Sequence, residues 1–309
     1  MGEVIDTSSS ENVVATRTGG SNGTVDSFLP WYFVGAVAIA SGVALAAVAL
    51  LGPLVLGTIE YRTSVSGVWQ IEGGDLVNLV LITPILILGG VLHLMRRPGA
   101  RYLLILSPVT LMYTGLSLGM GQEWGNPAYD GNVEQYAWLF LVLIIGGLIL
   151  LIASLSMFTE RDAPVFRRGS LRVFVAVMCL FLIMFAVMWL SELMEVMSTG
   201  DTSTGSYEAT PTLWWIVRYL DLGITIPLGF VGLFLLLTKP ERSYPLVLLF
   251  FGFFVTLGTA VLSMGVIMTI NEDPEAQPGG LLIFGVLAAI SWFGLLYLVK
   301  DKLPIRSAR

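Results

Sequence analysis

Uncharged apolar runs recur along the whole chain, and they constrain its fold more than any other feature. A run of about 18 or more apolar residues is long enough to cross the hydrocarbon core of a bilayer as a helix. Inside that core the backbone must satisfy its own hydrogen bonds, which a helix does within one segment. The sequence therefore predicts an all-α, polytopic transmembrane helical bundle of about eight spans: 31–57, 76–94, 102–119, 136–158, 173–197, 213–237, 244–270 and 281–299.

Composition excludes a soluble protein. Of the 309 residues, 55% are hydrophobic and 12% are charged, and a soluble domain would carry about twice that share of charge. Because the connections are short, we expect no extramembrane domain. The predicted organisation is a disordered cytoplasmic tail (1–28), a first four-helix half (29–158), a cytoplasmic loop (159–172), a second four-helix half (173–300) and a cytoplasmic tail (301–309).

Residues for metal, redox or histidine chemistry are scarce. Cys179 is the only cysteine and His93 the only histidine. This excludes disulfides within one chain, cysteine metal sites and haem held by two histidines. We therefore expect no cofactor, no metal site and no catalytic residue. An enzyme would have to work with carboxylates alone.

Charge alternates between successive connections. The basic residues gather in every second connection, and the intervening connections are acidic, with Arg62 as their only basic residue. Basic loops remain on the cytoplasmic side of a membrane. The pattern predicts a multi-pass protein of the plasma membrane with both termini in the cytoplasm and acidic loops outside. Aromatic pairs near span ends, such as Trp214 and Trp215, are typical of the interfacial belt.

The second and sixth spans match when they are aligned on Pro84 and Pro227. Each has a polar residue nine positions before its proline and another six positions before it: Asp75 and Asn78, and Arg218 and Asp221. Small polar residues also recur every three or four positions in the third and seventh spans, which places them on one helix face that should turn toward other helices. These matches indicate an internal repeat of two parallel halves, an arrangement found in some transporters.

Arg218 and Asp221 are predicted to lie near the outer boundary of the membrane. From Arg218 to cytoplasmic Lys239 is 21 residues, roughly 31 Å of helix at about 1.5 Å per residue. Counting from Arg172 places Glu192 and Glu195 at a similar depth. The expected site is therefore one layer, with Asp75 and Asn78 at equivalent depth in the other half.

Two interpretations of this layer remain open. Charges in a membrane span usually face the interior or a wet cavity and mark a ligand or ion pathway. Pro84 and Pro227 interrupt their helices, and Pro227 leaves the carbonyl of Gly223 without its helical donor. The same charges would alternatively form only a structural ion pair, in which Arg218 binds Glu192 or Asp221.

The stretch "RYLDLGITIPL" resembles the third helix of microbial rhodopsins, in which an Arg-Tyr-x-Asp motif precedes a threonine and a proline. The resemblance would make Asp221 a counter-ion. A retinal Schiff base needs a lysine within a later span, and the lysines here are Lys239, Lys300 and Lys302, none of which lies in mid-span. We therefore reject retinal binding.

A second resemblance covers most of the chain from about Asp75 onward. "GGDLVNLVLITPILILGGVLHLMRRPGARYLLIL" together with "YLDLGITIPLGFVGLFLLL" is similar to a group of uncharacterised prokaryotic multi-pass membrane proteins of about eight spans. Members show an acidic-Leu-Val start to one span, a basic turn and a later Leu-Asp-Leu-Gly span. The resemblance implies the topology and no activity.

The leading hypothesis is a transporter or ion-handling protein with a charged site in the outer leaflet. The alternative is a non-transporting sensor, assembly factor or lipid-binding accessory protein, in which the intramembrane charges are structural. A membrane enzyme comes third. The expected partners are the lipid bilayer and a small molecule or ion, and not nucleic acid, and the sequence leaves the oligomeric state open.

Overall fold

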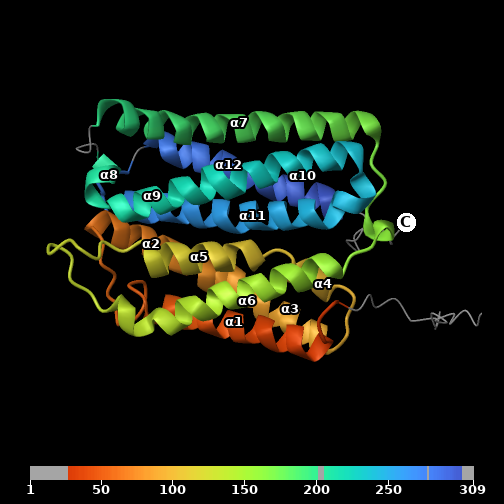
Figure 1. Cartoon of the computed structure of the whole chain (residues 1–309), viewed down its shortest axis with the longest axis horizontal. Helices are drawn as coiled ribbons and strands as arrows, with labels where there is room; N and C mark the ends of the chain where they lie inside the picture. Colours follow the sequence, from red (N-terminus) through yellow and green to blue (C-terminus); the bar gives the residue numbers. More distant parts are fainter. Residues whose placement is uncertain (1–26, 201–204, 277, 301–309) are drawn as a thin grey trace, which may run out of the picture.

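The computed structural model describes residues 27–200, 205–276 and 278–300, and every regular element in these residues is helical. Within these described residues, eight helical spans are long and apolar enough to cross a membrane, and Figure 1 shows that they lie roughly along a common axis. The prediction of an all-α bundle of about eight spans is confirmed. Apart from Ser27 and Phe28, the predicted tails 1–28 and 301–309 lie outside the described residues.

Several spans are built from more than one helical element, and a π-helical segment lies between α-helices in the second and sixth spans. In chain order the elements are α1 (Trp31–Leu51), α2 (Val65–Val77), the π-helix η1 (Asn78–Ile82), α3 (Thr83–Leu94), α4 (Ala100–Leu104), α5 (Pro108–Met120), the 3-10 helix η2 (Val133–Tyr136), α6 (Ala137–Ser156), the 3-10 helix η3 (Glu160–Asp162), α7 (Arg168–Thr199), α8 (Gly205–Ala209), α9 (Pro211–Leu220), the π-helix η4 (Asp221–Thr225), α10 (Ile226–Thr238), α11 (Pro240–Ile270) and α12 (Pro278–Val299).

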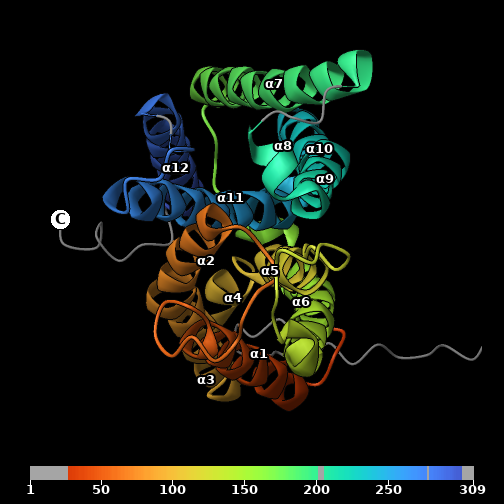
Figure 2. The same cartoon turned by 90° about the vertical axis from the view of Figure 1, so that its left-hand side faces the viewer.

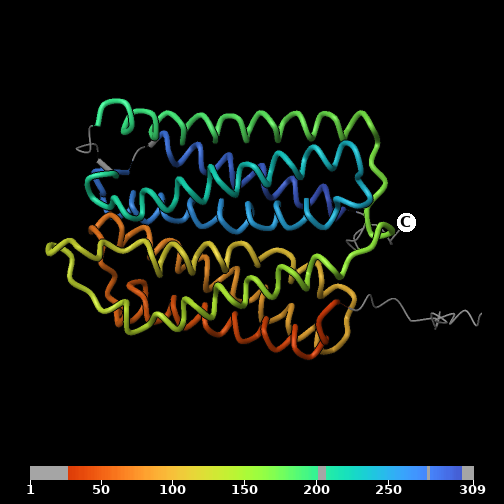
Figure 3. The backbone as a smooth tube through the Cα atoms, viewed as in Figure 1, coloured from red at the N-terminus to blue at the C-terminus, as the bar shows by residue number. Residues whose placement is uncertain are grey.

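The spans form two groups of four that follow the order of the chain (Figures 1 and 2). In the first group, α1 packs on α3 and α6, and α5 packs on α6. In the second group, α11 packs on α10 and α12, and α10 packs on α7. Helix α11 also packs against α2 and α5, so it joins the two groups and is the most buried of the eight spans. Figure 3 traces the single passage of the chain from the first group to the second, between α6 and α7.

Close approach between the groups depends on small residues. A side-chain carbon added at Gly73 of α2 would lie 2.4 Å from the backbone of Met264 in α11, and one added at Gly252 would lie 2.5 Å from the backbone of Leu106. Between these two places Thr110 and Thr256 are hydrogen-bonded through their hydroxyls at 2.5 Å. The predicted inward orientation of the small polar residues is confirmed for this pair, because both are buried.

The second span starts earlier than its apolar run indicated. Helix α2 begins at Val65, where Ser64 accepts a hydrogen bond from the backbone N–H of Gly67. Glu72 and Asp75, which the sequence placed in a connection, therefore lie inside a helix. The helix extends through this polar segment because Gly73 and Gly74 pack on Met264, so one of its faces is covered by protein. The first span is shorter than predicted and ends at Leu51.

The two spans that contain Pro84 and Pro227 each include a π-helical turn. The N–H of Thr83 donates to the carbonyl of Asn78, and the N–H of Ile226 donates to the carbonyl of Asp221. Each donor is thus bonded five residues back, and a proline comes next. Pro227 cannot donate a backbone hydrogen bond to the turn before it. Single π turns within α-helices are rare and frequent at functional sites.

The connections alternate between two ends of the bundle. Arg96, Arg101 and Arg161 lie in or next to connections at the basic end, and Glu60 and Glu123 lie in connections at the acidic end. The start of α1 and the end of α12 both lie at the basic end, where Arg96 stacks on the ring of Trp31 at 4.5 Å and Ser170 is hydrogen-bonded to Tyr297 at 3.0 Å.

Candidate functional site

Arg218 is the central cation of the predicted layer. It lies in the last turn of α9, and its guanidinium forms an ion pair with Glu192 of α7. The side chain of Arg218 is 9% exposed and that of Glu192 is 41% exposed, so the pair is open on the glutamate side only. The partner of Arg218 that the sequence left undecided is therefore Glu192.

Two tryptophans enclose the same guanidinium. Its central carbon lies 4.3 Å from the ring of Trp189 in α7 and 4.1 Å from the ring of Trp214 in α9. Its Nη1 also points to the Trp214 carbonyl at 3.5 Å. A cation between two aromatic faces is stabilised by both ring quadrupoles. Arg218 therefore links α7 to α9 by charge and by stacking.

Asp221 opens the π-helix η4 and is 2% exposed. Thr225, Trp189 and Tyr113 surround its carboxyl group within interaction distance, and Arg218 acts on it electrostatically. Tyr113 belongs to α5, so Asp221 faces the first group of spans. Among the described residues, Oδ1 of Asp221 and Nε1 of Trp189 are both buried without a hydrogen bond of good geometry. Unpaired buried polar atoms cost free energy, so this cluster is unsatisfied by the protein alone.

Glu195 was predicted to share the layer, but it is not among the groups that contact Arg218 or Asp221. It is exposed on α7, and its side chain makes none of the polar contacts of Arg218 or Asp221. Sequence reasoning placed it there because it is one turn from Glu192.

Asp75 and Asn78 form a second, separate cluster. Both are buried, with 1% and 5% exposure. The groups that act on Asp75 are Asn78, Glu72 and Tyr61, all in the first group of spans. The structure therefore gives each group one polar cluster beside its π turn and does not bring the two clusters into one constellation.

Sequence reasoning missed three aromatic members of the site. Trp214 was assigned to the interfacial belt but is 4% exposed and covers Arg218. Trp189 is three residues before Glu192, so helix periodicity alone would have placed both on one face of α7. Tyr113 carries no local signal, because it reaches Asp221 from a different span.

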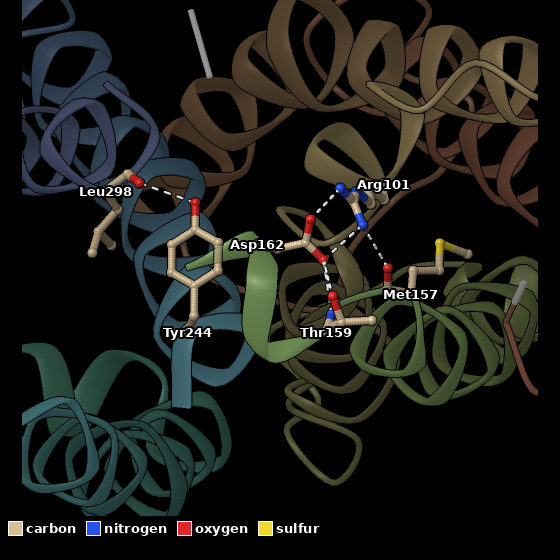
Figure 4. A network of polar contacts seen from close by, with 6 residues as sticks. All are labelled: Arg101, Met157, Thr159, Asp162, Tyr244 and Leu298. Atoms are coloured by element: carbon tan, nitrogen blue, oxygen red, sulfur yellow. Dashed lines mark hydrogen bonds and ion pairs between the residues drawn. The ribbon is translucent and has the colours of Figure 1, made fainter. Parts of the chain in front are cut away.

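A polar network at the basic end was also missed (Figure 4). Arg101 of α4 binds both carboxylate oxygens of Asp162 in η3, at 2.9 and 2.5 Å, and donates to the Met157 carbonyl at 2.9 Å. Asp162 also accepts from the N–H and hydroxyl of Thr159, at 2.8 and 3.0 Å. Beside it, Tyr244 of α11 donates to the Leu298 carbonyl at 3.0 Å. The network fixes the passage between the two groups.

The electrostatics of Asp162 follow from these contacts. Burial opposes the charged form, but the hydrogen bonds from Thr159 and the guanidinium of Arg101 outweigh it, so the pKa of Asp162 lies below its ordinary value. Asp162 is thus a fixed anion that holds Arg101 in place.

The acidic end is held by contacts between loops. Arg62 donates to Glu134 at 2.9 Å and to the Gly131 carbonyl at 2.7 Å. Glu123 of the first group accepts from the N–H and hydroxyl of Thr212, at 2.9 and 3.1 Å, and so caps the start of α9. The one basic residue of the acidic loops therefore has a structural role, and Glu123 positions the helix that carries Arg218.

The arrangement around Arg218 and Asp221 is suited to binding charge rather than to covalent chemistry. Three or more His, Cys, Asp or Glu side chains do not meet as a metal site in the part of the chain that the structure describes. A carboxyl group with an unpaired oxygen, next to hydroxyl and indole groups, can accept a proton or a small cation.

Comparison with known proteins identifies no relative: no protein-family model, curated protein or solved structure matches the chain. These comparisons therefore do not support the resemblance to a group of uncharacterised multi-pass proteins with a family match. The eight long apolar helices nevertheless establish the broad class. The chain is an integral, multi-pass membrane protein in contact with the lipid bilayer.

Proposed function

We propose that the protein is a transporter or ion-handling protein whose site is centred on Asp221, with Arg218 and Glu192 as its charged wall. One observation carries this proposal: a carboxyl group with an unpaired oxygen is buried where a π turn and a proline interrupt a span. Burying such a group is costly. Ionisable groups inside spans are characteristic of ion and substrate pathways. Tyr113 adds a contact from the other group of spans, so a rearrangement between the groups would alter the site.

The proposal includes an internal duplication, with 29–158 and 173–300 as parallel halves. The two π turns support it, since each begins six residues before its proline, at Asn78 and at Asp221. In this alignment Asp75 and Asn78 are the counterparts of Arg218 and Asp221. Interrupted helices at corresponding positions of two halves are characteristic of transporter binding sites.

The proposal also sets the orientation. The acidic end, with Glu192 open to it and Glu195 exposed nearby, would face out of a prokaryotic plasma membrane, and the basic end with both termini would face the cytoplasm. The positive-inside rule supports this direction. The site would then be reached from the outside.

The alternative function is a non-transporting sensor, assembly factor or lipid-binding accessory protein. The tryptophan enclosure of Arg218 favours it, because an arginine with an ion pair and two aromatic faces needs no ligand. In that case Arg218 and Glu192 only hold α7 against α9.

Thiol labelling distinguishes the two functions. In a background in which Cys179 is replaced by Ser, Thr225→Cys places a probe next to Asp221, and Thr256→Cys places a control in the buried contact between the groups. With the protein in liposomes, a site reached by water predicts that an impermeant thiol reagent modifies the Thr225→Cys variant and not the Thr256→Cys variant. Equal protection of both variants would support the structural alternative.

A further inference from the structure

Asp75 is a buried carboxyl group that the protein leaves unpaired. It lies in α2, three residues before η1, and is 1% exposed. Among the described residues, neither of its oxygens accepts a hydrogen bond of good geometry. The side chain of Asn78 lies within interaction reach, yet it pairs neither oxygen in that geometry.

Among the residues that the structure describes, the groups that act on Asp75 include no cation. Its electrostatic neighbour is Glu72, a second carboxylate, and Tyr61 lies close enough to interact through a hydroxyl that is itself buried and unpaired. Gly52, the residue that follows the end of α1, lies so close that an added side-chain carbon would be 2.4 Å from Oδ2 of Asp75. Helix α11 presents Met264, which is not titratable, to the neighbouring Gly73 and Gly74.

The two polar clusters differ in this respect. Asp221 has the guanidinium of Arg218 within electrostatic reach. The alignment of the two spans puts Asp75 at the position of Arg218, so the first cluster has an acid where the second has its built-in cation. An ionised carboxylate without a counter-ion, beside another anion and shielded from water, is strongly disfavoured.

We propose that Asp75 is a proton-binding site, at which a proton joins one carboxylate oxygen and the neutral acid shares a hydrogen bond with the hydroxyl of Tyr61. Addition of the proton forms one O–H bond and removes the uncompensated charge, and its release restores the carboxylate. The inference deepens the proposed function, because it names the ion that the first group of spans takes up. Proton binding at Asp75 is expected in the folded protein without an ion gradient, and it does not require transport.

Infrared spectroscopy of the full chain in lipid tests the site. The expected result at neutral pH in sodium-free buffer is a protonated-carboxyl band that shifts in D2O and disappears in Asp75→Asn. Tyr61→Phe should shift the band by removing its hydrogen-bond partner, and Glu72→Gln should retain it. If Asp75→Asn does not fold, Asp75→Glu serves instead and moves the band.

Three results would overturn the inference. The first is that Asp75→Asn removes no protonated-carboxyl band from the spectrum, and the second is that only Asp221→Asn removes the band. The third is that sodium abolishes the band at constant pH, because the site would then bind a metal cation. The spectrum is recorded without an ion gradient, so it does not depend on transport. If the protein shows the band but transports no ion, the proposed transport function is contradicted and the proton-binding site at Asp75 is not.

Discussion

Arg218 forms its ion pair with Glu192 of α7, twenty-six residues earlier in the chain, and not with Asp221, which follows it by three residues on the same span. The guanidinium is thereby turned toward α7 and the two tryptophans. Asp221 is left facing Tyr113 with an unpaired oxygen. The pairing thus separates an ion-paired cation from an acid with an unpaired oxygen within one layer.

Replacing Arg218 with Gln should destabilise the protein by about 2 kcal/mol, because Glu192 loses its counter-ion and two indole rings lose a cation. Thermal unfolding in detergent measures the loss. Replacing Glu192 with Gln as well should restore part of it. The matched control is Arg242→Gln, whose pair with Glu160 is exposed on both sides and should contribute about 0.5 kcal/mol or less. Equal effects of Arg218→Gln and Arg242→Gln would contradict the assigned pair.

Asp162→Asn should lower the free energy of unfolding by about 2 to 4 kcal/mol at neutral pH, because Arg101 then lacks its anion. The pKa of Asp162 is lower in the folded state than its ordinary value. Its contribution is therefore complete above the unfolded-state pKa of about 3.9 and is lost as pH falls through the folded-state pKa. Unfolding of wild type and variant from pH 7 downward measures this. If the difference in unfolding free energy between wild type and Asp162→Asn increased as the pH fell, the assigned role of Asp162 would be contradicted.

Glu123→Ala should cost about 1 kcal/mol, the usual effect of losing a helix cap, and should increase amide exchange at Thr212 in the first turn of α9. Glu134→Ala is the control, because its carboxylate binds Arg62 and caps no helix of the second group. Unchanged exchange at Thr212 in Glu123→Ala would show that the cap does not hold α9.

Gly73→Ala and Gly252→Ala should each destabilise the protein by about 1 to 3 kcal/mol, the cost of overpacking, because the added carbon would meet backbone of the other group. The matched control is Gly223→Ala. A side-chain carbon added at Gly223 would meet open space, so this substitution should be neutral or slightly stabilising. Unfolding in detergent compares the three variants. A similar loss in all three would point to helix geometry rather than to contact between the groups.

The sequence predicted the fold class, because hydropathy and the lengths of the apolar runs are local properties. It predicted that Arg218 lies near Glu192, since both positions were counted from basic residues at the cytoplasmic side. It also predicted the correspondence of Asn78 with Asp221, and both residues begin a π turn.

The rest depends on contacts that no local pattern encodes. The start of α2 was misplaced because Glu72 and Asp75 interrupt the apolar run, while packing on α11 keeps the segment helical. Tyr113 and Trp189 reach Asp221 from other spans, and Arg101 meets Asp162 across sixty-one residues of chain. Such pairs require the tertiary arrangement.

Ion flux into liposomes that contain Asp221→Asn tests the central claim most directly. Wild-type protein should move protons or another small cation along an imposed gradient, read with a pH-sensitive or cation-sensitive dye. Asp221→Asn should keep the wild-type unfolding temperature but lose flux by about tenfold or more, which corresponds to about 1.4 kcal/mol in the transport barrier. Glu195→Gln, at an exposed position outside the cluster, should keep wild-type flux. A folded Asp221→Asn protein with undiminished flux, or wild-type flux no greater than that of empty liposomes, would contradict the account.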